Sequence, residues 1–173
     1  MRGLGIAVAL GGLLGLSLSA AAQQPVQPAG PTGRANLILV ATAARPDSVL
    51  AGLRTYLVSN GFVVDTLDPA RGLLTTQVQA PAETLAEQTK IRVVRVAEGW
   101  KLTGLYLMGG PLNSGYTAFP AMYFGLNDAP AKTAFRQVEA AARAIAGGTL
   151  RYGRAKVRFG AFTKWEDALK MPW

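Results

Sequence analysis

Four basic side chains late in the sequence have the types and spacing to bind an anion. Arg154, Lys156 and Arg158 alternate with apolar residues, and Arg151 lies just before them. If this segment is a strand, every second side chain points to one face, so the three alternating bases form a positive strip. Such a strip attracts phospholipid head groups, lipopolysaccharide, polyanions or an acidic protein surface. The alternative is a solvated strand face that binds nothing.

Positive charge is concentrated around this candidate strip. Residues 132–173 hold nine basic and three acidic side chains, whereas residues 23–131 hold eight and seven. The whole chain has a formal net charge of +8 at pH 7. We therefore expect a partner of opposite charge at this end of the domain.

A second group of candidate contact residues is apolar or aromatic and lies in a segment rich in glycine and proline, residues 109–127: Tyr116, Phe119, Met122, Tyr123 and Phe124. Loops of this length are uncommon in compact domains unless they are functional or contain an element. One interpretation is an apolar lobe that contacts a partner or ligand. The alternatives are that the rings cap the apolar face of a sheet, or that residues 122–125 form a further strand.

Catalytic chemistry has little support in the sequence. The chain has no histidine and no cysteine, which removes the usual general base, the histidine-assisted nucleophiles and the ligands of tetrahedral zinc. No serine lies in a nucleophile motif, and no glycine-rich phosphate loop is present. Two carboxylate pairs, Asp65 with Asp68 and Glu83 with Glu87, are the candidates for glycoside hydrolysis. We expect no enzyme activity, no metal and no cofactor.

The elements that must position these residues follow from apolar periodicity and turn residues. The pattern predicts strands at 36–42, 62–67, 73–79, 90–97 and 100–108, helices at 46–60 and 128–146, a short strand at 150–159, and a helical turn at 164–170. Short turns join 62–67 to 73–79 and 90–97 to 100–108, so each pair forms a hairpin. The predicted fold is α+β, with an antiparallel sheet of about five strands and two helices packed on one face.

The first 22 residues have the features of a secretory signal peptide. Arg2 precedes an apolar run, and Ala20-Ala21-Ala22 supplies the small residues of a cleavage site before Gln23. The apolar run is too short to span a bilayer, so we expect export without a retained anchor. Residues 23–33 form a flexible leader rich in proline, glutamine and glycine, and residues 34–173 form a single domain with a basic C-terminal segment. The expected location is the periplasm or the extracellular space.

The segment Val49–Thr76 resembles the helix-grip modules of BamC-like bacterial envelope lipoproteins. Its helix ends at Asn60-Gly61 before a strand, and the turn Asp68-Pro69-Ala70-Arg71-Gly72 precedes a strand that contains threonine. The resemblance implies a non-enzymatic envelope domain whose sheet or helix face contacts another protein. The chain has no cysteine that could carry the lipid of that family.

These observations predict an exported binding or assembly module of the bacterial envelope. Its partner is expected to be an envelope protein or an anionic lipid or glycolipid surface, whereas nucleic acid is not expected outside the cytoplasm. Two alternatives stay open. One is a small carboxylate-dependent hydrolase of cell-wall glycans, and the other is a lipid carrier with an apolar cavity between the helices and the sheet.

Overall fold

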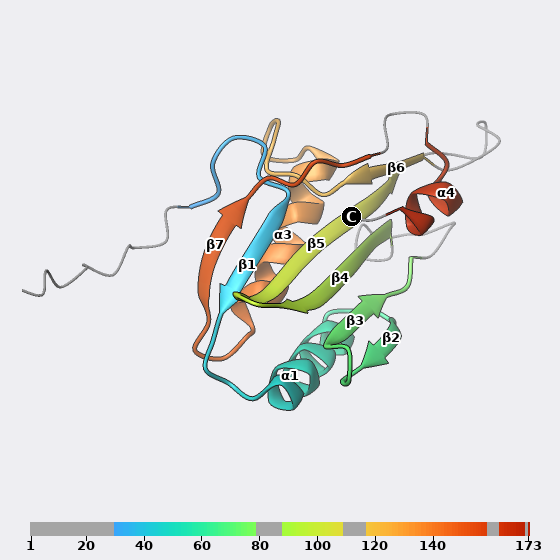
Figure 1. The fold of residues 1–173 in the computed structure, drawn as a ribbon. Helices are drawn as coiled ribbons and strands as arrows, with labels where there is room; N and C mark the ends of the chain where they lie inside the picture. Colours follow the sequence, from blue (N-terminus) through green and yellow to red (C-terminus); the bar gives the residue numbers. More distant parts are fainter. Residues whose placement is uncertain (1–29, 79–87, 109–116, 159–162, 172) are drawn as a thin grey trace, which may run out of the picture.

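All strand pairs of the protein are antiparallel in the residues that the computed structural model describes. These are residues 30–78, 88–108, 117–158, 163–171 and 173. Seven strands form one sheet in the order β2-β3-β4-β5-β1-β7, and β6 pairs with β5 (Figure 1). Three helices accompany the sheet in these residues. The predicted α+β class is confirmed, but the prediction of about five strands is wrong because the sheet also includes β6 and β7.

The element bounds follow the predicted ones closely where turn residues set them. The strands are β1 (Leu37–Ala41), β2 (Val64–Asp68), β3 (Leu73–Thr76), β4 (Thr89–Val96), β5 (Gly99–Met108), β6 (Thr117–Pro120) and β7 (Thr149–Gly153), and the helices are α1 (Pro46–Ser59), α3 (Pro130–Arg143) and α4 (Trp165–Lys170). Both predicted hairpins, β2-β3 and β4-β5, are present. Each of the two longer helices has a proline in its first turn, where the missing N–H has no intrahelical partner to lose.

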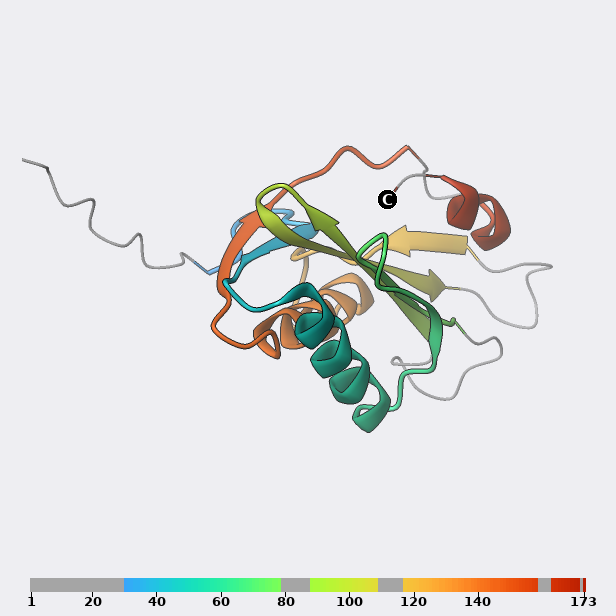
Figure 2. The ribbon, with the colours of Figure 1, turned by 60° about the horizontal axis from the view of Figure 1, so that its bottom comes forward.

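One face of the sheet, the inner face, carries the main hydrophobic core. Figure 2 shows α1 and α3 on the same side of the sheet. Their buried side chains form one cluster with inner-face residues of β1, β4 and β5, including Phe135 of α3, Leu53 of α1 and Leu102 of β5. Gly104 of β5 lets α3 come close, because a Cβ atom there would lie 2.6 Å from Cγ2 of Val138. No described helix is long and apolar enough to cross a membrane.

The opposite face, the outer face, is only partly covered. The chain that follows β7 runs over this side of the sheet, and α4 lies at one end of it (Figure 2). A small second cluster joins Leu107 of β5 and Ala118 of β6 to Ala168 of α4. The rest of the outer face presents the alternate residues of β3, β4 and β5.

The predicted strand at 150–159 is wrong in its second half. β7 ends at Gly153, and residues 154–158 form no ladder with a neighbouring strand. The alternation of bases and apolar residues there resembles a strand, but the segment instead crosses above the outer face. The predicted long loop of residues 109–127 contains a strand, β6, at Thr117–Pro120. This strand lies earlier than residues 122–125, where the sequence offered one.

Candidate anion-binding site on the outer face of the sheet

The floor of the candidate site is the outer face of β4 and β5. The strand register places Arg92 opposite Thr103 and Val94 opposite Lys101. Directly opposed residues of an antiparallel pair point to the same face, and diagonal neighbours lie roughly 7–8 Å apart. Arg92 and Lys101 form such a diagonal pair, so two positive charges share this face.

One wall of the site is the segment of residues 154–158, which the buried side chain of Asn36 holds in place. The Asn36 side-chain amide donates to the carbonyl oxygen of Ala155 at 3.0 Å, and its Oδ1 accepts from the Ala155 N–H at 2.7 Å. The amide side chain thus replaces the peptide group that a neighbouring strand would offer. Lys156 and Arg158, which follow Ala155, are exposed.

The opposite wall is Trp173, which contacts Arg92 in two ways. Nη1 of Arg92 donates to the backbone oxygen of Trp173 at 3.0 Å. The guanidinium carbon also lies 5.8 Å from the centroid of the indole ring, within the range of a cation–π contact. Arg92 therefore fixes an aromatic side chain beside the basic floor.

These parts enclose a pocket of about 440 Å³ on the outer face, which we call the basic groove. Its lining combines a minority of charged residues with apolar ones, and the charged members are Arg92, Lys101, Lys156 and Arg158. None of the residues that line it is acidic. A neighbouring pocket shares Lys156 with the groove and adds Arg154. The surface can therefore attract and hold an anion.

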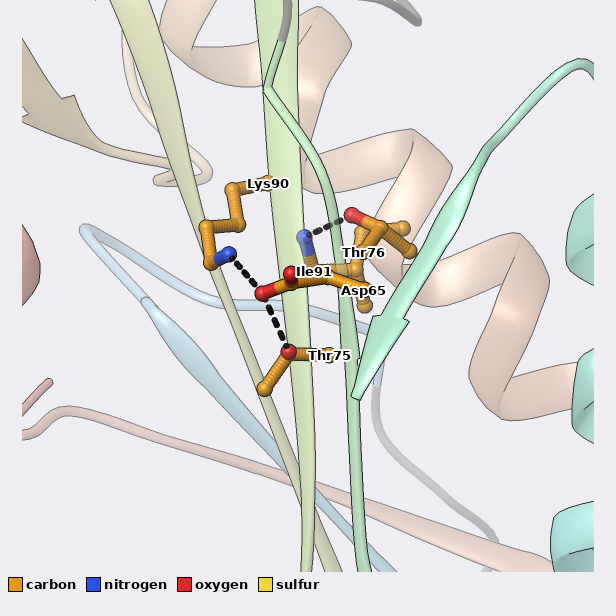
Figure 3. A network of polar contacts seen from close by, with 5 residues as sticks. All are labelled: Asp65, Thr75, Thr76, Lys90 and Ile91. Atoms are coloured by element: carbon orange, nitrogen blue, oxygen red, sulfur yellow. Dashed lines mark hydrogen bonds and ion pairs between the residues drawn. The ribbon is translucent and has the colours of Figure 1, made fainter. Parts of the chain in front are cut away.

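An acidic side chain does lie next to the basic groove, but a base already neutralises it. Figure 3 shows Oδ2 of Asp65 accepting from Nζ of Lys90 at 2.9 Å and from Oγ1 of Thr75 at 3.1 Å. The hydrogen bond from Lys90 is the main reason why the pKa of Asp65 lies below its usual value. On the inner side of the same strands, Oγ1 of Thr76 accepts from the Ile91 N–H at 2.9 Å. This network fixes β2, β3 and β4 beside the groove.

The structure brings all four predicted bases to the outer face of the sheet or to the segment that crosses it. Lys156 and Arg158 line the basic groove, and Arg154 lines the neighbouring pocket. Arg151 of β7 lies opposite Leu39, which lies opposite Lys101, so it points to the same face but lines neither pocket. Sequence reasoning missed the three floor and wall residues, Arg92, Lys101 and Trp173. The alternation of bases with Ile91 and Val93 along β4 was the available signal for Arg92, since it marks a solvent-facing side of a strand.

The described residues of the predicted apolar lobe lie in different surroundings. Phe119 stacks on Tyr106 with ring centroids 5.4 Å apart, and Tyr123 meets Phe135 edge-on at 6.0 Å, so both rings pack against the main core. Phe124 is exposed, and the Arg34 guanidinium lies over its ring at 4.5 Å. Met122 lines the pocket next to the groove. Tyr116 lies outside the described residues.

The candidate carboxylate pairs do not converge where the structure describes them. Asp65 is engaged by Lys90, while Asp68 accepts from the Arg71 N–H and pairs with its guanidinium at 3.6 Å. Glu83 and Glu87 lie outside the described residues. Among those described, no three acidic side chains gather to hold a metal ion.

Comparison with known proteins gives no assignment. No protein-family model matches the chain, and no curated protein matches it significantly. The basic groove itself is therefore the basis for a functional proposal.

Proposed function

We propose that the protein is an exported, non-enzymatic binding module that takes an anionic component of the bacterial envelope on the outer face of its sheet. The observation that carries the proposal is the basic groove, in which four cationic side chains and no acidic one line a single pocket. Like charges that share one face repel each other, so an anion that neutralises them stabilises the complex.

The ion pairing and exposure of the individual basic side chains support an anion as the partner of the groove. Across the described residues, Lys101, Lys156 and Arg158 have no ion pair, whereas Lys90 next to the groove is already paired with Asp65. Burial differs as well, since Lys101 is half-buried on the floor while Lys156 and Arg158 are exposed on the wall. The groove therefore offers one fixed and two adaptable positive charges to a ligand.

The remaining parts of the proposal rest on the sequence. Residues 1–22 act as a signal peptide, and the exported domain is a helix-grip-like module with both longer helices packed on one face of the sheet. The engagement of Asp65 and Asp68 in structural contacts favours binding over carboxylate-dependent hydrolysis. The BamC-like resemblance of Val49–Thr76 agrees with an envelope role without enzyme activity.

Vesicle binding tests the proposed function. The protein is expected to cosediment with phosphatidylglycerol vesicles at low salt, to be released at high salt, and to ignore phosphatidylcholine vesicles. A triple variant, Lys101→Gln with Lys156→Gln and Arg158→Gln, is expected to lose affinity by on the order of 100-fold, because a base near an anionic surface contributes about 1 kcal/mol.

A second triple variant provides the matched control, because it removes the same charge from exposed positions outside the groove that have no ion pair in the described residues: Arg45→Gln, Arg54→Gln and Arg95→Gln. This control is expected to retain most of the affinity. Equal losses for the two triple variants, or equal binding of the protein to both kinds of vesicle, would contradict the proposal.

A further inference from the structure

We infer that the basic groove binds a single amphiphilic anion, a molecule that joins a carboxylate or phosphate head to an apolar chain. This inference rests on the proposed function and names the class of ligand. It follows from the lining of the groove, where apolar surface and unpaired positive charge lie side by side.

The apolar half of the groove is formed by both its floor and its walls. Val94 and Leu105 contribute from the sheet, and Val157 and Trp173 contribute from the two walls. A site for a simple anion needs positive charge and N–H donors but no such surface. Ligand pockets that take larger molecules are lined mainly by apolar and aromatic side chains, with a few polar groups that fix orientation.

The charged side chains of the groove adjoin its apolar ones. Val94 lies directly opposite Lys101 in the β4-β5 register, so an apolar side chain adjoins a cation on the floor. On the wall, Val157 stands between Lys156 and Arg158 in the sequence, and all three line the groove. A chain resting on the valines would bring its anionic end to the lysines and arginine.

Arg92 has a different role from the other three bases. Its guanidinium contacts the backbone oxygen and the ring of Trp173. It therefore positions the indole as an apolar wall, while Lys101, Lys156 and Arg158 remain for the head group. The volume of about 440 Å³ lies within the range of small-molecule pockets, roughly 300–1,000 Å³.

Titration of the full protein with defined probes tests the inference by calorimetry, with all amphiphiles kept as monomers. Dodecanoate or dodecyl phosphate is expected to bind at least about tenfold more tightly than octanoate, because burial of additional methylene groups strengthens binding. Inorganic phosphate is expected to bind only weakly. Dodecyl maltoside, which has the same chain and no charge, is expected not to bind.

Two single variants separate the two halves of the site. Val157→Ser is expected to weaken dodecanoate binding several-fold and leave phosphate binding unchanged, whereas Lys101→Gln is expected to weaken both. Both positions are incompletely buried, and circular dichroism checks that the variants fold. Because Trp173 lines the groove, dodecanoate is expected to change the tryptophan fluorescence of the wild type. Trp173→Phe keeps an apolar wall and is expected to bind dodecanoate without that change.

The outcomes distinguish this inference from the proposed function. Binding of phosphate and of anionic vesicles without any gain from the chain would overturn the inference and leave the proposed function intact. Absence of binding to every anion would overturn both. Dodecanoate binding that neither Val157→Ser nor Lys101→Gln changes would place the amphiphile elsewhere and also overturn the inference.

Discussion

Asp65 and Lys90 mark the border of the basic groove by cancelling each other's charge. Lys90 keeps only 13% of its side chain exposed, and its ammonium group donates to a carboxylate that is 43% exposed. Thr75 adds a second donor to the same oxygen. Without Asp65, the positive charge of Lys90 would adjoin that of the groove, so this one carboxylate limits the extent of the positive surface.

The lowered pKa of Asp65 predicts how its contribution to stability depends on pH. The folded protein binds this proton less readily than the unfolded chain, so Asp65 stabilises the fold above the unfolded value of 3.8 and loses this effect as the pH falls through its folded pKa. Asp65→Asn is expected to lower the free energy of unfolding by about 0.5 kcal/mol at pH 7, since solvent screens the pair. Urea unfolding at pH 7, 5 and 3 measures the difference, which is expected to shrink at the lowest pH.

Asp167→Asn is the control for this measurement. The Asp167 carboxylate meets Lys170 at 3.6 Å, and both side chains are largely exposed. This variant is expected to match the wild type within error at all three pH values. A stability deficit for Asp65→Asn that stays constant from pH 7 to pH 3 would show that the Lys90 ion pair is not its cause.

At the scale of elements, β5 is the strand on which both faces depend. Its inner side packs under α3 through Gly104, its outer side supplies Lys101 and Thr103 to the groove, and its edges pair with β4, β1 and β6. A glycine within a strand marks the close approach of a neighbour. The helix layer and the basic groove therefore share one strand.

This dependence predicts a large effect for Gly104→Ala. The new Cβ atom would lie 2.6 Å from Cγ2 of Val138 and 2.9 Å from Cβ of Ala121, so β5 and α3 must separate. The expected loss is about 1–3 kcal/mol in the free energy of unfolding, measured by urea denaturation. Gly52→Ala on α1, where no atom lies within 4 Å of the added Cβ, is expected to stabilise by up to about 1 kcal/mol. Equal effects of the two variants would rule out the steric explanation.

Local patterns determined which elements could be predicted from the sequence. The two hairpins and both longer helices have their own turn residues and apolar periodicity, so no distant contact is needed to recognise them. β6 has only four residues and ends in Pro120, and its identity as a strand depends on pairing with β5. The segment of residues 154–158 has the alternation of a strand but is held by the side chain of Asn36, which no local pattern encodes.

The same distinction explains why the candidate site was only half predicted. Arg154, Lys156 and Arg158 are close in sequence, so their alternation could be read directly. Arg92 and Lys101 become neighbours of that segment only after the sheet has formed and the chain has crossed its outer face. Trp173 joins them through a contact between residues 81 positions apart.

At the scale of the whole molecule, the two faces of the sheet differ in character. The inner face buries the main core under α1 and α3, and the outer face gathers unpaired positive charge in the groove. Because like charges in one pocket repel each other, we expect the groove to lower the stability of the fold when no anion is bound. Sites that are arranged for function commonly carry such a cost in stability.

Removal of this repulsion is expected to raise the melting temperature. The double variant Lys101→Gln with Arg158→Gln is expected to gain about 0.5 kcal/mol at low salt, or about 1–2 °C. The difference from wild type is expected to fall in high salt, which screens the charges. Arg45→Gln with Arg54→Gln removes the same net charge from outside the groove and is expected to shift the melting temperature less. A larger gain for this second pair would show that net charge, rather than the groove, sets the effect.

The two hydrogen bonds between Asn36 and Ala155 have a consequence for the order in which the groove forms, because these residues are 119 positions apart in the chain. As the chain is synthesised, β4 and β5, which form the floor of the groove, are made before residues 154–158, which supply one of its walls. If the groove binds an anion as proposed, capture therefore waits for this late segment, and retention of the anion would report that the segment is in place.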